Sequence, residues 1–535
     1  MKTRYFLAIS VVLLSAVACN KFLDTMPDNR AEVDSPAKVK ALLVSAYATR
    51  HFQLFAEMYS DNADDNAKVV SNATPGRYYE QIWNWIDITE TANDSPDNVW
   101  ESNWGAIAAA NQALEAIEQL GGKDDPDLSP SYGEALICRA YAHFTLVNLF
   151  CLNYNAATSA VDQGIPYMDA PEQGLSPQYE RGNVAEVYER IEQDIVEGLK
   201  YLGDTYSVPK YHFTRQAAYA FATRFYLFYE KWDKAVEMAD NCLGNAPESL
   251  LRDYDDLQTS PDIATGTVSY VASDVKANLL LQTNMSSLAR YQFRNYGGAN
   301  KRFAFTTSIA ETEVMFAKHP WQKTGCTATA YRYRPRSYNS SNLHYTLIWK
   351  VPGLFEYTDP VAGRGYAQTI VPSFTADNVL LERAEAYVML KDYESACADL
   401  NLWIQNMYVP ESDVIEQITP ESVKEFYDGV DYYTWEDPTG KKHLNPSFAI
   451  DGEGSVQESM IHAVLNAKRI ENLFNGLRWF DIKRYGIEIV RRHVDDNAYF
   501  ESISDTMAKD DPRRAFQVPQ KARDAGFEPT KRAGK

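Results

Sequence analysis

The residues best suited to chemistry are the acids clustered in DNADDN, residues 61–66. Closely spaced carboxylate and amide oxygens can ligate calcium, but a calcium loop also needs a central glycine and a distal glutamate. This stretch has neither. We therefore favour a turn with helix-capping side chains over a calcium site, and we predict no bound metal or cofactor.

Catalytic side chains form no recognisable motif. The eight histidines, from His51 to His493, are scattered, and the chain contains no HExxH, GxSxG or Walker sequence. Glycoside hydrolysis needs only two converging carboxyl groups, but nothing in the sequence singles out a pair among 73 acids. A surface glycan hydrolase is therefore the weaker hypothesis, and we predict that the protein is not an enzyme.

The N-terminus predicts export and a lipid anchor. A basic start precedes an almost entirely apolar run, residues 5–18, which is short for a membrane span and typical of a secretory signal. The run ends in LSAVAC, whose small residues before Cys19 resemble a bacterial lipobox, although Ala16 stands where leucine is usual. We predict a signal peptide at 1–18 and acylation of Cys19.

Charge and cysteine count limit the partners and the covalent bonds. A net charge of −21 argues against nucleic acid or anionic lipid as a partner, because both require a basic surface. Five cysteines follow Cys19, an odd number that excludes a fully paired disulfide framework. They are Cys138, Cys151, Cys242, Cys326 and Cys397. We interpret them as buried small hydrophobic residues.

Helical periodicity dominates the chain. Apolar residues recur at i, i+3 and i+4 in the stretches 133–150, 184–202, 215–243 and 377–404. The last two share an aromatic–aromatic–alanine pattern with spacings of six and three. Its members are Tyr226, Trp232 and Ala235 in one stretch and Tyr387, Tyr393 and Ala396 in the other. Each stretch predicts two antiparallel helices joined by a tight turn, which is a degenerate tetratricopeptide pattern.

Two more helix pairs and several long insertions complete the predicted organisation. We expect 133–150 to pair with 184–202, and 35–52 with 98–120. The insertions are rich in Gly, Pro, Ser, Asn and Tyr, which favours loops and short strands; they span 151–183, 251–375 and 407–456. The predicted fold is mostly α, a tetratricopeptide-like helical repeat scaffold with long loop-rich insertions and few short strands. We divide it into an N-terminal part, 19–250, and a C-terminal part, 251–535.

The stretch RIENLFNGLRWFDIKRYG, residues 469–486, predicts an amphipathic helix whose pattern breaks near its end. At about 100° per residue, Trp479 falls opposite the apolar stripe and Asp481 falls within it. Such a helix must be covered on both faces, and Asp481 lies within reach of Arg478 and Arg484. We interpret the stretch as part of the scaffold and not as a ligand site.

Five segments, in this order, resemble the SusD-like (SusD/RagB) outer-membrane nutrient-binding lipoproteins of Bacteroidetes. They are CNKFLDTMP (19–27), VWESNWGAIAAANQALEAIE (99–118), GEALICRAYAHFTLVNLF (133–150), the 469–486 stretch and RAFQVPQKARDAG (514–526). The chain departs from the family pattern at Asn475, where glutamate is usual, and at Gln517, where proline is usual.

The resemblance implies a non-catalytic lipoprotein that binds a glycan or oligosaccharide and passes it to a partner SusC-like TonB-dependent transporter. It implies anchoring in the outer membrane, facing the cell exterior. The same transport role with a peptide or another non-glycan ligand stays open as an alternative.

The resemblance also implies ligand-binding aromatic rings in the loop before the first Trp-rich repeat helix. Here that loop contains RYYEQIWNWID, residues 77–87. Trp83 and Trp85 are two residues apart, so an extended strand would place both rings on one face. A strand of the core would show the same pattern, so both interpretations stay open.

The long insertion is the second region where the resemblance implies binding rings. Tyr296 precedes a Gly-Gly turn and Trp321 follows a proline in a polar loop, so we expect both rings to be exposed. Arg77 and Asn295 are the polar neighbours that we expect to form hydrogen bonds with a ligand.

Overall fold

The computed structural model describes residues 33–70, 76–172, 179–292, 302–323, 334–340, 344–408, 416–497 and 499–531. The predicted signal peptide, Cys19, Asn295 and Tyr296 lie outside these ranges. Within them, no helix is long and apolar enough to cross a membrane.

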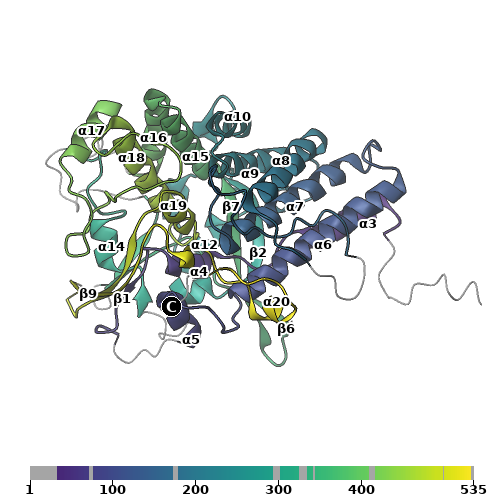
Figure 1. Cartoon of the computed structure of the whole chain (residues 1–535), viewed down its shortest axis with the longest axis horizontal. Helices are drawn as coiled ribbons and strands as arrows, with labels where there is room; N and C mark the ends of the chain where they lie inside the picture. The colour runs from purple at the N-terminus through teal and green to yellow at the C-terminus, as the bar shows by residue number, and fades with distance from the viewer. Residues whose placement is uncertain are drawn as a thin grey trace, which may run out of the picture.

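The helical repeats form four pairs, as predicted. They are α3 (Pro36–Leu43) with α6 (Pro96–Leu120), α7 (Ser129–Phe150) with α8 (Val184–Tyr201), α9 (Arg215–Phe228) with α10 (Trp232–Leu243), and α15 (Ala376–Met389) with α16 (Tyr393–Met407). Because α6 also packs on α7, α8 on α9 and α10 on α15, the pairs join into one array that runs from α3 to α16 (Figure 1). The division into two parts at residue 250 remains a prediction.

The two tight turns between paired helices have the same backbone geometry. Glu230, between α9 and α10, has a φ of 60°, and Lys391, between α15 and α16, has a φ of 63°. The predicted close-packing residues Ala235 and Ala396 are both fully buried. The tetratricopeptide-like pattern is therefore confirmed in the two stretches where its spacing is regular.

Short strands and helices fill the insertions. The sheets are β3-β1-β8-β9, β2-β7-β6 and β4-β5. Their strands are β1 (Asp64–Asp65), β2 (Asn278–Met285), β3 (Phe303–Ala304), β4 (Ser337–Ser340), β5 (Tyr345–Ile348), β6 (Leu354–Asp359), β7 (Arg364–Thr375), β8 (Ile489–Val494) and β9 (Phe500–Met507). The other helices are α4 (Gln53–Tyr59), α5 (Arg77–Trp83), α11 (Tyr254–Gln258), α12 (Ile263–Tyr270), α13 (Leu288–Gln292), α14 (Thr307–Thr312), α17 (Pro420–Asp428), α18 (Val456–Glu471), α19 (Arg478–Arg484) and α20 (Gln520–Asp524).

The prediction of one helix over 469–486 is wrong. Helix α18 ends at Glu471 and α19 begins at Arg478. Between them, Phe474 and Gly476 take φ values of 66° and 73°. The Glu57 carboxylate accepts hydrogen bonds from the backbone N–H groups of both residues, each at 3.0 Å. A buried acid of α4 therefore compensates this turn for its missing helical hydrogen bonds.

Trp479 and Asp481 are both buried, which confirms that the segment is covered on both faces. Trp479 contacts the Tyr59 ring edge-on, with centroids 4.9 Å apart. Asp481 pairs with Lys468 at 2.5 Å and lies 3.6 Å from Arg484. The expected pairing of Asp481 with Arg478 is wrong, because Arg478 pairs with a more distant acid in the sequence.

That acid is Asp61, and the predicted turn with helix-capping side chains at 61–66 is wrong. Asp61 is buried and lies 2.8 Å from Arg478, 3.2 Å from Lys442 and 3.5 Å from Arg469. The neighbouring Asp64 is in strand β1 and accepts a 2.9 Å hydrogen bond from a buried arginine, Arg492. The acidic cluster is thus the anionic half of a buried ion-pair network, here named the Asp61 network.

Replacing Asp61 tests this network. Asp61→Asn would keep the shape of the side chain but remove the carboxylate that pairs with buried Arg478, while Lys442 and Arg469 would keep Glu313 at 2.8 and 3.1 Å. Because Arg478 would stay buried without its partner, we expect a loss of about 3–5 kcal/mol in the free energy of unfolding. Urea denaturation would measure it. Asp34→Asn is the control, because Asp34 forms an exposed 2.8 Å pair with Lys38 and exposed pairs contribute little to stability. Equal stability of the two variants would contradict the assignment.

Candidate functional site

An aromatic pocket of about 510 Å³ is lined by residues of helix α6, of the loop after α7 and of the C-terminal segment. We name it the α6 pocket. Its lining comprises Trp100, Trp104, Ile107, Ala108, Asn111, Pro166, Met168, Ala170, Glu172, Tyr179, Ala522, Ala525, Gly526 and Phe527. Ligand sites are typically concave and mostly apolar with a few polar groups, and this pocket has that composition.

Two tryptophans one helical turn apart supply the aromatic wall. Trp100 and Trp104 are neighbours on one face of α6, with ring centroids 5.5 Å apart and an interplanar angle of 68°. Phe527 meets Trp100 edge-on, also at 5.5 Å. Trp100 is nearly buried, whereas Trp104 is half-buried. The pocket therefore offers Trp104 as its more accessible ring.

A polar network holds the opposite wall in place. The Asn111 side chain donates to the carbonyl oxygens of Met168 at 3.0 Å and Ala170 at 3.2 Å. Its own oxygen accepts from Arg139 at 2.9 Å, and Arg139 makes a bidentate pair with buried Asp194, both contacts at 2.7 Å. Asn111 is therefore fully engaged, and its role is to position the loop rather than to contact a ligand.

Glu172 and Tyr179 provide the polar edge. The Tyr179 hydroxyl donates to the Glu172 carboxylate at 2.6 Å. Burial and this hydrogen bond raise the pKa of Tyr179 to about 12, so the phenol stays protonated at neutral pH. Glu172 is exposed and keeps an oxygen that can accept from a ligand hydroxyl. Among the described residues that line the pocket, it is the only carboxylate.

The C-terminal segment closes the third side. Lys521 of α20 pairs with Glu101 at 2.8 Å and with Asp97 at 3.2 Å, which fastens α20 to α6. The next turn places Phe527 in the pocket, because its backbone N–H bonds to Ala522 O at 2.9 Å. This wall comes from residues more than 400 positions after α6 in the sequence.

Trp83 and Trp85, two of the predicted binding residues, are buried in the core. The strand expected for them is wrong, since α5 ends at Trp83 and Trp85 takes a φ of 50°. The rings lie 4.5 Å and 4.1 Å from the guanidinium of Arg491, and cation–π attraction is strong where water is excluded. Arg491 also donates to the carbonyl of Trp83 at 2.6 Å. These tryptophans surround a buried cation and have no accessible ring face.

Of the other predicted site residues, the structure describes Trp321 and Arg77, and neither lines the α6 pocket. Trp321 was expected to be exposed, but it is fully buried and stacks on His319 with centroids 4.5 Å apart. Arg77 is exposed on α5 and lies 3.3 Å from Glu90, whereas Tyr296 and Asn295 lie outside the described residues. The proline before Trp321 led the sequence analysis to expect a surface loop, and the tertiary packing overrides that local signal.

Comparisons with known proteins show which family and which solved structures this chain is similar to. A family model for SusD-like proteins, described as "Starch-binding associating with outer membrane", matches residues 21–227. The fold resembles a putative sugar binding protein from Bacteroides vulgatus ATCC 8482 at 17% identity and a TM-score of 0.63, covering 94% of this chain and 99% of that one. Residues 21–227 of the chain thus match the SusD-like family, and the chain as a whole has the SusD-like fold. None of the curated proteins matches the sequence.

Two further solved structures share the fold of this SusD-like protein. A SusD superfamily protein from Bacteroides thetaiotaomicron VPI-5482 matches at 17% identity and a TM-score of 0.62, covering 93% of this chain and all of the other. One from Bacteroides fragilis matches at 18% identity and a TM-score of 0.60, covering 92% and 98%. The predicted mostly α fold class is thereby confirmed, and the match of residues 21–227 supports the predicted family.

The sequence analysis of this SusD-like protein missed the α6 pocket. Trp100 and Trp104 were recognised only as part of a repeat helix, although their spacing of four already places both rings on one face. Phe527 carried no signal, because nothing in the sequence brings the C-terminal segment next to α6. The helical spacing of Trp100 and Trp104 therefore indicated one wall of the pocket, whereas the wall that contains Phe527 could not be predicted from the sequence.

The burial of Trp83 gives a direct test. Trp83→Ala would remove a fully buried ring beside Arg491, so we expect a loss of about 3–5 kcal/mol in the free energy of unfolding. Urea denaturation followed by circular dichroism would measure it. Arg77→Ala, at an exposed position on the same helix, should change stability by less than about 0.5 kcal/mol. An unchanged midpoint for Trp83→Ala would show that this ring is not part of the core.

Proposed function

We propose that this SusD-like protein binds a carbohydrate in the α6 pocket. The observation that carries the proposal is the accessible Trp104 ring beside the Glu172 carboxylate in one concavity. Sugar rings present C–H faces that pack on aromatic rings, and their hydroxyls donate to carboxylates. A single carboxylate in the described lining supports binding without turnover, since hydrolysis uses a pair.

Similarity to known proteins supports the same ligand class. The matching family model carries the description starch-binding, and one of the solved structures with this fold is a putative sugar binding protein. We propose a glycan or oligosaccharide as the ligand on this basis. We further propose that the protein passes this ligand to a SusC-like TonB-dependent transporter.

The proposed place of action is the outer membrane, facing the cell exterior. The family description associates these proteins with that membrane. Acylation at Cys19 would supply the anchor, because the apolar run before it resembles a lipoprotein signal. One acyl chain binds a bilayer only reversibly, so stable attachment needs a second chain or a second contact.

Filling the pocket tests carbohydrate binding without removing any packing contact. Ala108 is exposed on α6 and lines the pocket, so Ala108→Phe would occupy the ligand volume. We expect a loss of affinity of about ten-fold or more, equivalent to roughly 1.4 kcal/mol, at an unchanged melting temperature. Isothermal titration calorimetry against a panel of neutral and acidic oligosaccharides would measure it.

The matched control for this experiment is Glu115→Phe. Glu115 is exposed two turns further along the same face of α6 and outside the pocket lining. It should bind like the wild type. If Ala108→Phe also binds like the wild type, the carbohydrate site is elsewhere; if the wild type binds no saccharide in the panel, the proposed function is wrong.

The anchor has its own test. Cys19→Ser removes the acylation site, so the variant should move from the membrane fraction to the soluble fraction while its fold stays intact. Fractionation of cells that express each form would show this, with surface proteolysis of intact cells reporting exposure. A wild-type protein that is entirely soluble in the periplasm would contradict both the anchor and the location.

A further inference from the structure

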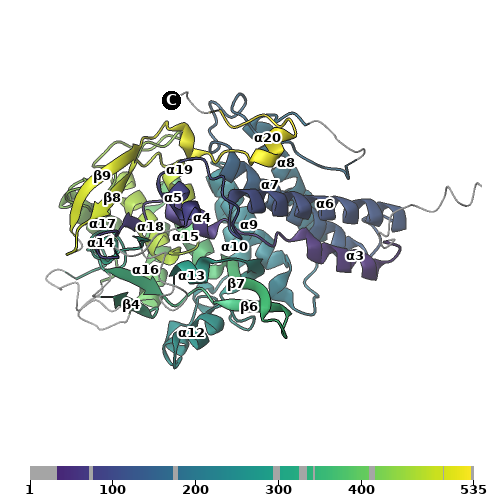
Figure 2. The same cartoon turned by 90° about the horizontal axis from the view of Figure 1, so that it is seen from below.

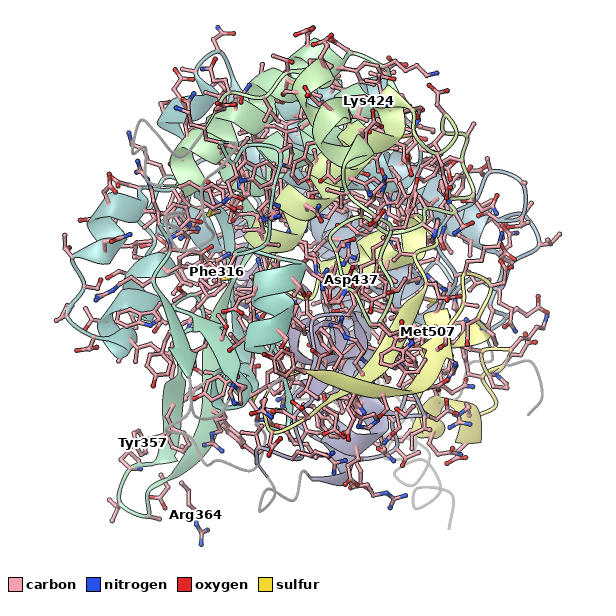
Figure 3. The ribbon with its side chains drawn as sticks, turned by 90° about the vertical axis from the view of Figure 1, so that its left-hand side faces the viewer. Phe316, Tyr357, Arg364, Lys424, Asp437 and Met507 are labelled. Carbon is pink, nitrogen blue, oxygen red and sulfur yellow. The ribbon has the colours of Figure 1, made fainter. Side chains whose placement is uncertain are left out.

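The β6–β7 hairpin projects from the body of the protein and carries aromatic rings on its surface (Figure 3). Phe355 is 39% exposed and Tyr357 is 58% exposed. In β6 they are two residues apart, so both rings lie on the same face of the hairpin. Their centroids are 4.8 Å apart with an interplanar angle of 69°.

The Phe355 and Tyr357 rings lie opposite small residues of β7. Phe355 pairs with Ala367, and Tyr357 pairs with Gly365. A Cβ added at Gly365 would lie 2.8 Å from the Phe355 ring, which is closer than any real contact. The Phe355 ring therefore lies down on the backbone of Gly365 and turns its other side to solvent.

Strand pairing and turn hydrogen bonds within the chain hold the β6–β7 hairpin, and with it the two rings, in place. Its base is held in the sheet by β2, which pairs with β7 from Met285 opposite Gln368 to Asn278 opposite Thr375. At the tip, Asp359 Oδ1 accepts hydrogen bonds from the backbone N–H groups of Val361 and Ala362 at 3.1 and 3.0 Å. Fixed strands on both sides of the turn make the two rings a preformed surface.

The area of the face favours a small ligand. With roughly 200 Å² for an aromatic side chain, the exposed fractions leave on the order of 200 Å² of ring surface, whereas a specific protein interface buries about 800 Å² on each partner. Arg364 is at the tip of the hairpin (Figure 3), where it pairs with Asp359 of β6 in the strand register. An aromatic surface of this size suits the apolar C–H face of a sugar ring.

We propose that the outer face of the β6–β7 hairpin, centred on Phe355 and Tyr357, is a second carbohydrate-binding platform. This rests on the proposed function, because the ligand is a segment of the same class of glycan. The hairpin and α20, which borders the α6 pocket, lie on opposite sides of the molecule (Figure 2). A short oligosaccharide cannot span both sites, so the hairpin serves long chains, whose retention rises when two sites engage.

Affinity electrophoresis in gels containing amylopectin, arabinoxylan, galactomannan or pectin tests this platform, with titration of short oligosaccharides beside it. Tyr357→Ala and Phe355→Ala should each weaken retention by the polysaccharide that holds the wild type by about three- to ten-fold. Affinity for the short oligosaccharide and the melting temperature should not change. Tyr499→Ala is the matched control, because Tyr499 is a 72% exposed ring near another strand turn.

Each other outcome overturns the proposal in a distinguishable way. Unchanged retention for both variants, while Ala108→Phe abolishes it, removes the platform and leaves the proposed function standing. Loss of sedimentation with phosphatidylcholine vesicles in Tyr357→Ala, with retention unchanged, makes the face a lipid contact. A wild type that no polysaccharide and no oligosaccharide retains contradicts the proposed function as well.

Discussion

The tertiary structure depends on the neutralisation of buried charge at Asp61. Three cations from separate segments, Arg469 in α18, Arg478 in α19 and Lys442 in the loop before them, converge on this one carboxylate. Burial alone would raise the pKa of Asp61, but Arg469, Arg478 and Lys442 lower it well below its usual range. Since a buried charge without its partner costs several kcal/mol, α18 and α19 are held against the loop after α4.

The same contacts position the α6 pocket from a distance. Residues that follow α19 are anchored in turn, because Arg514 donates to the carbonyl of Ile482 at 2.9 Å. Phe516 then packs on Tyr59 with centroids 4.6 Å apart, and its N–H bonds to Leu149 O at 2.9 Å. From there the chain reaches α20 and Phe527. The pocket wall is therefore an extension of the buried ionic junction and not an independent loop.

Buried cations of the C-terminal part also cap helices of the N-terminal part. Lys483 donates to the carbonyls of Asn148 and Cys151 at the end of α7, at 2.6 and 2.8 Å, and burial lowers its pKa to about 7. Arg484 donates to Leu227 O near the end of α9 at 3.1 Å. Arg491 donates to Met58 O near the end of α4 and to Trp83 O at the end of α5, at 3.0 and 2.6 Å. Unpaired carbonyls and the negative end of the helix dipole make these positions favourable for a cation. This accounts for the burial of Lys483 and Arg491, which have no carboxylate partner among the described residues, whereas Arg484 also pairs with Glu385 at 2.8 Å.

The sequence by itself determined the repeats, because helical periodicity and the alanines at tight turns are local properties that survive in any context. It also determined that 469–486 had to be covered on both faces. It did not reveal the break at Phe474 and Gly476, which depends on Glu57 from a segment more than 400 residues away. The same holds for the ligand surfaces. A polar loop suggested an exposed ring at Trp321, and the family resemblance left Trp83 open between binding ring and core. Only the tertiary structure decided that Trp83 packs on Arg491 and Trp321 stacks on His319, while Trp104 is partly exposed and Tyr357 is exposed. Exposure of a ring is set by what packs on it from distant parts of the chain, and no local pattern records that.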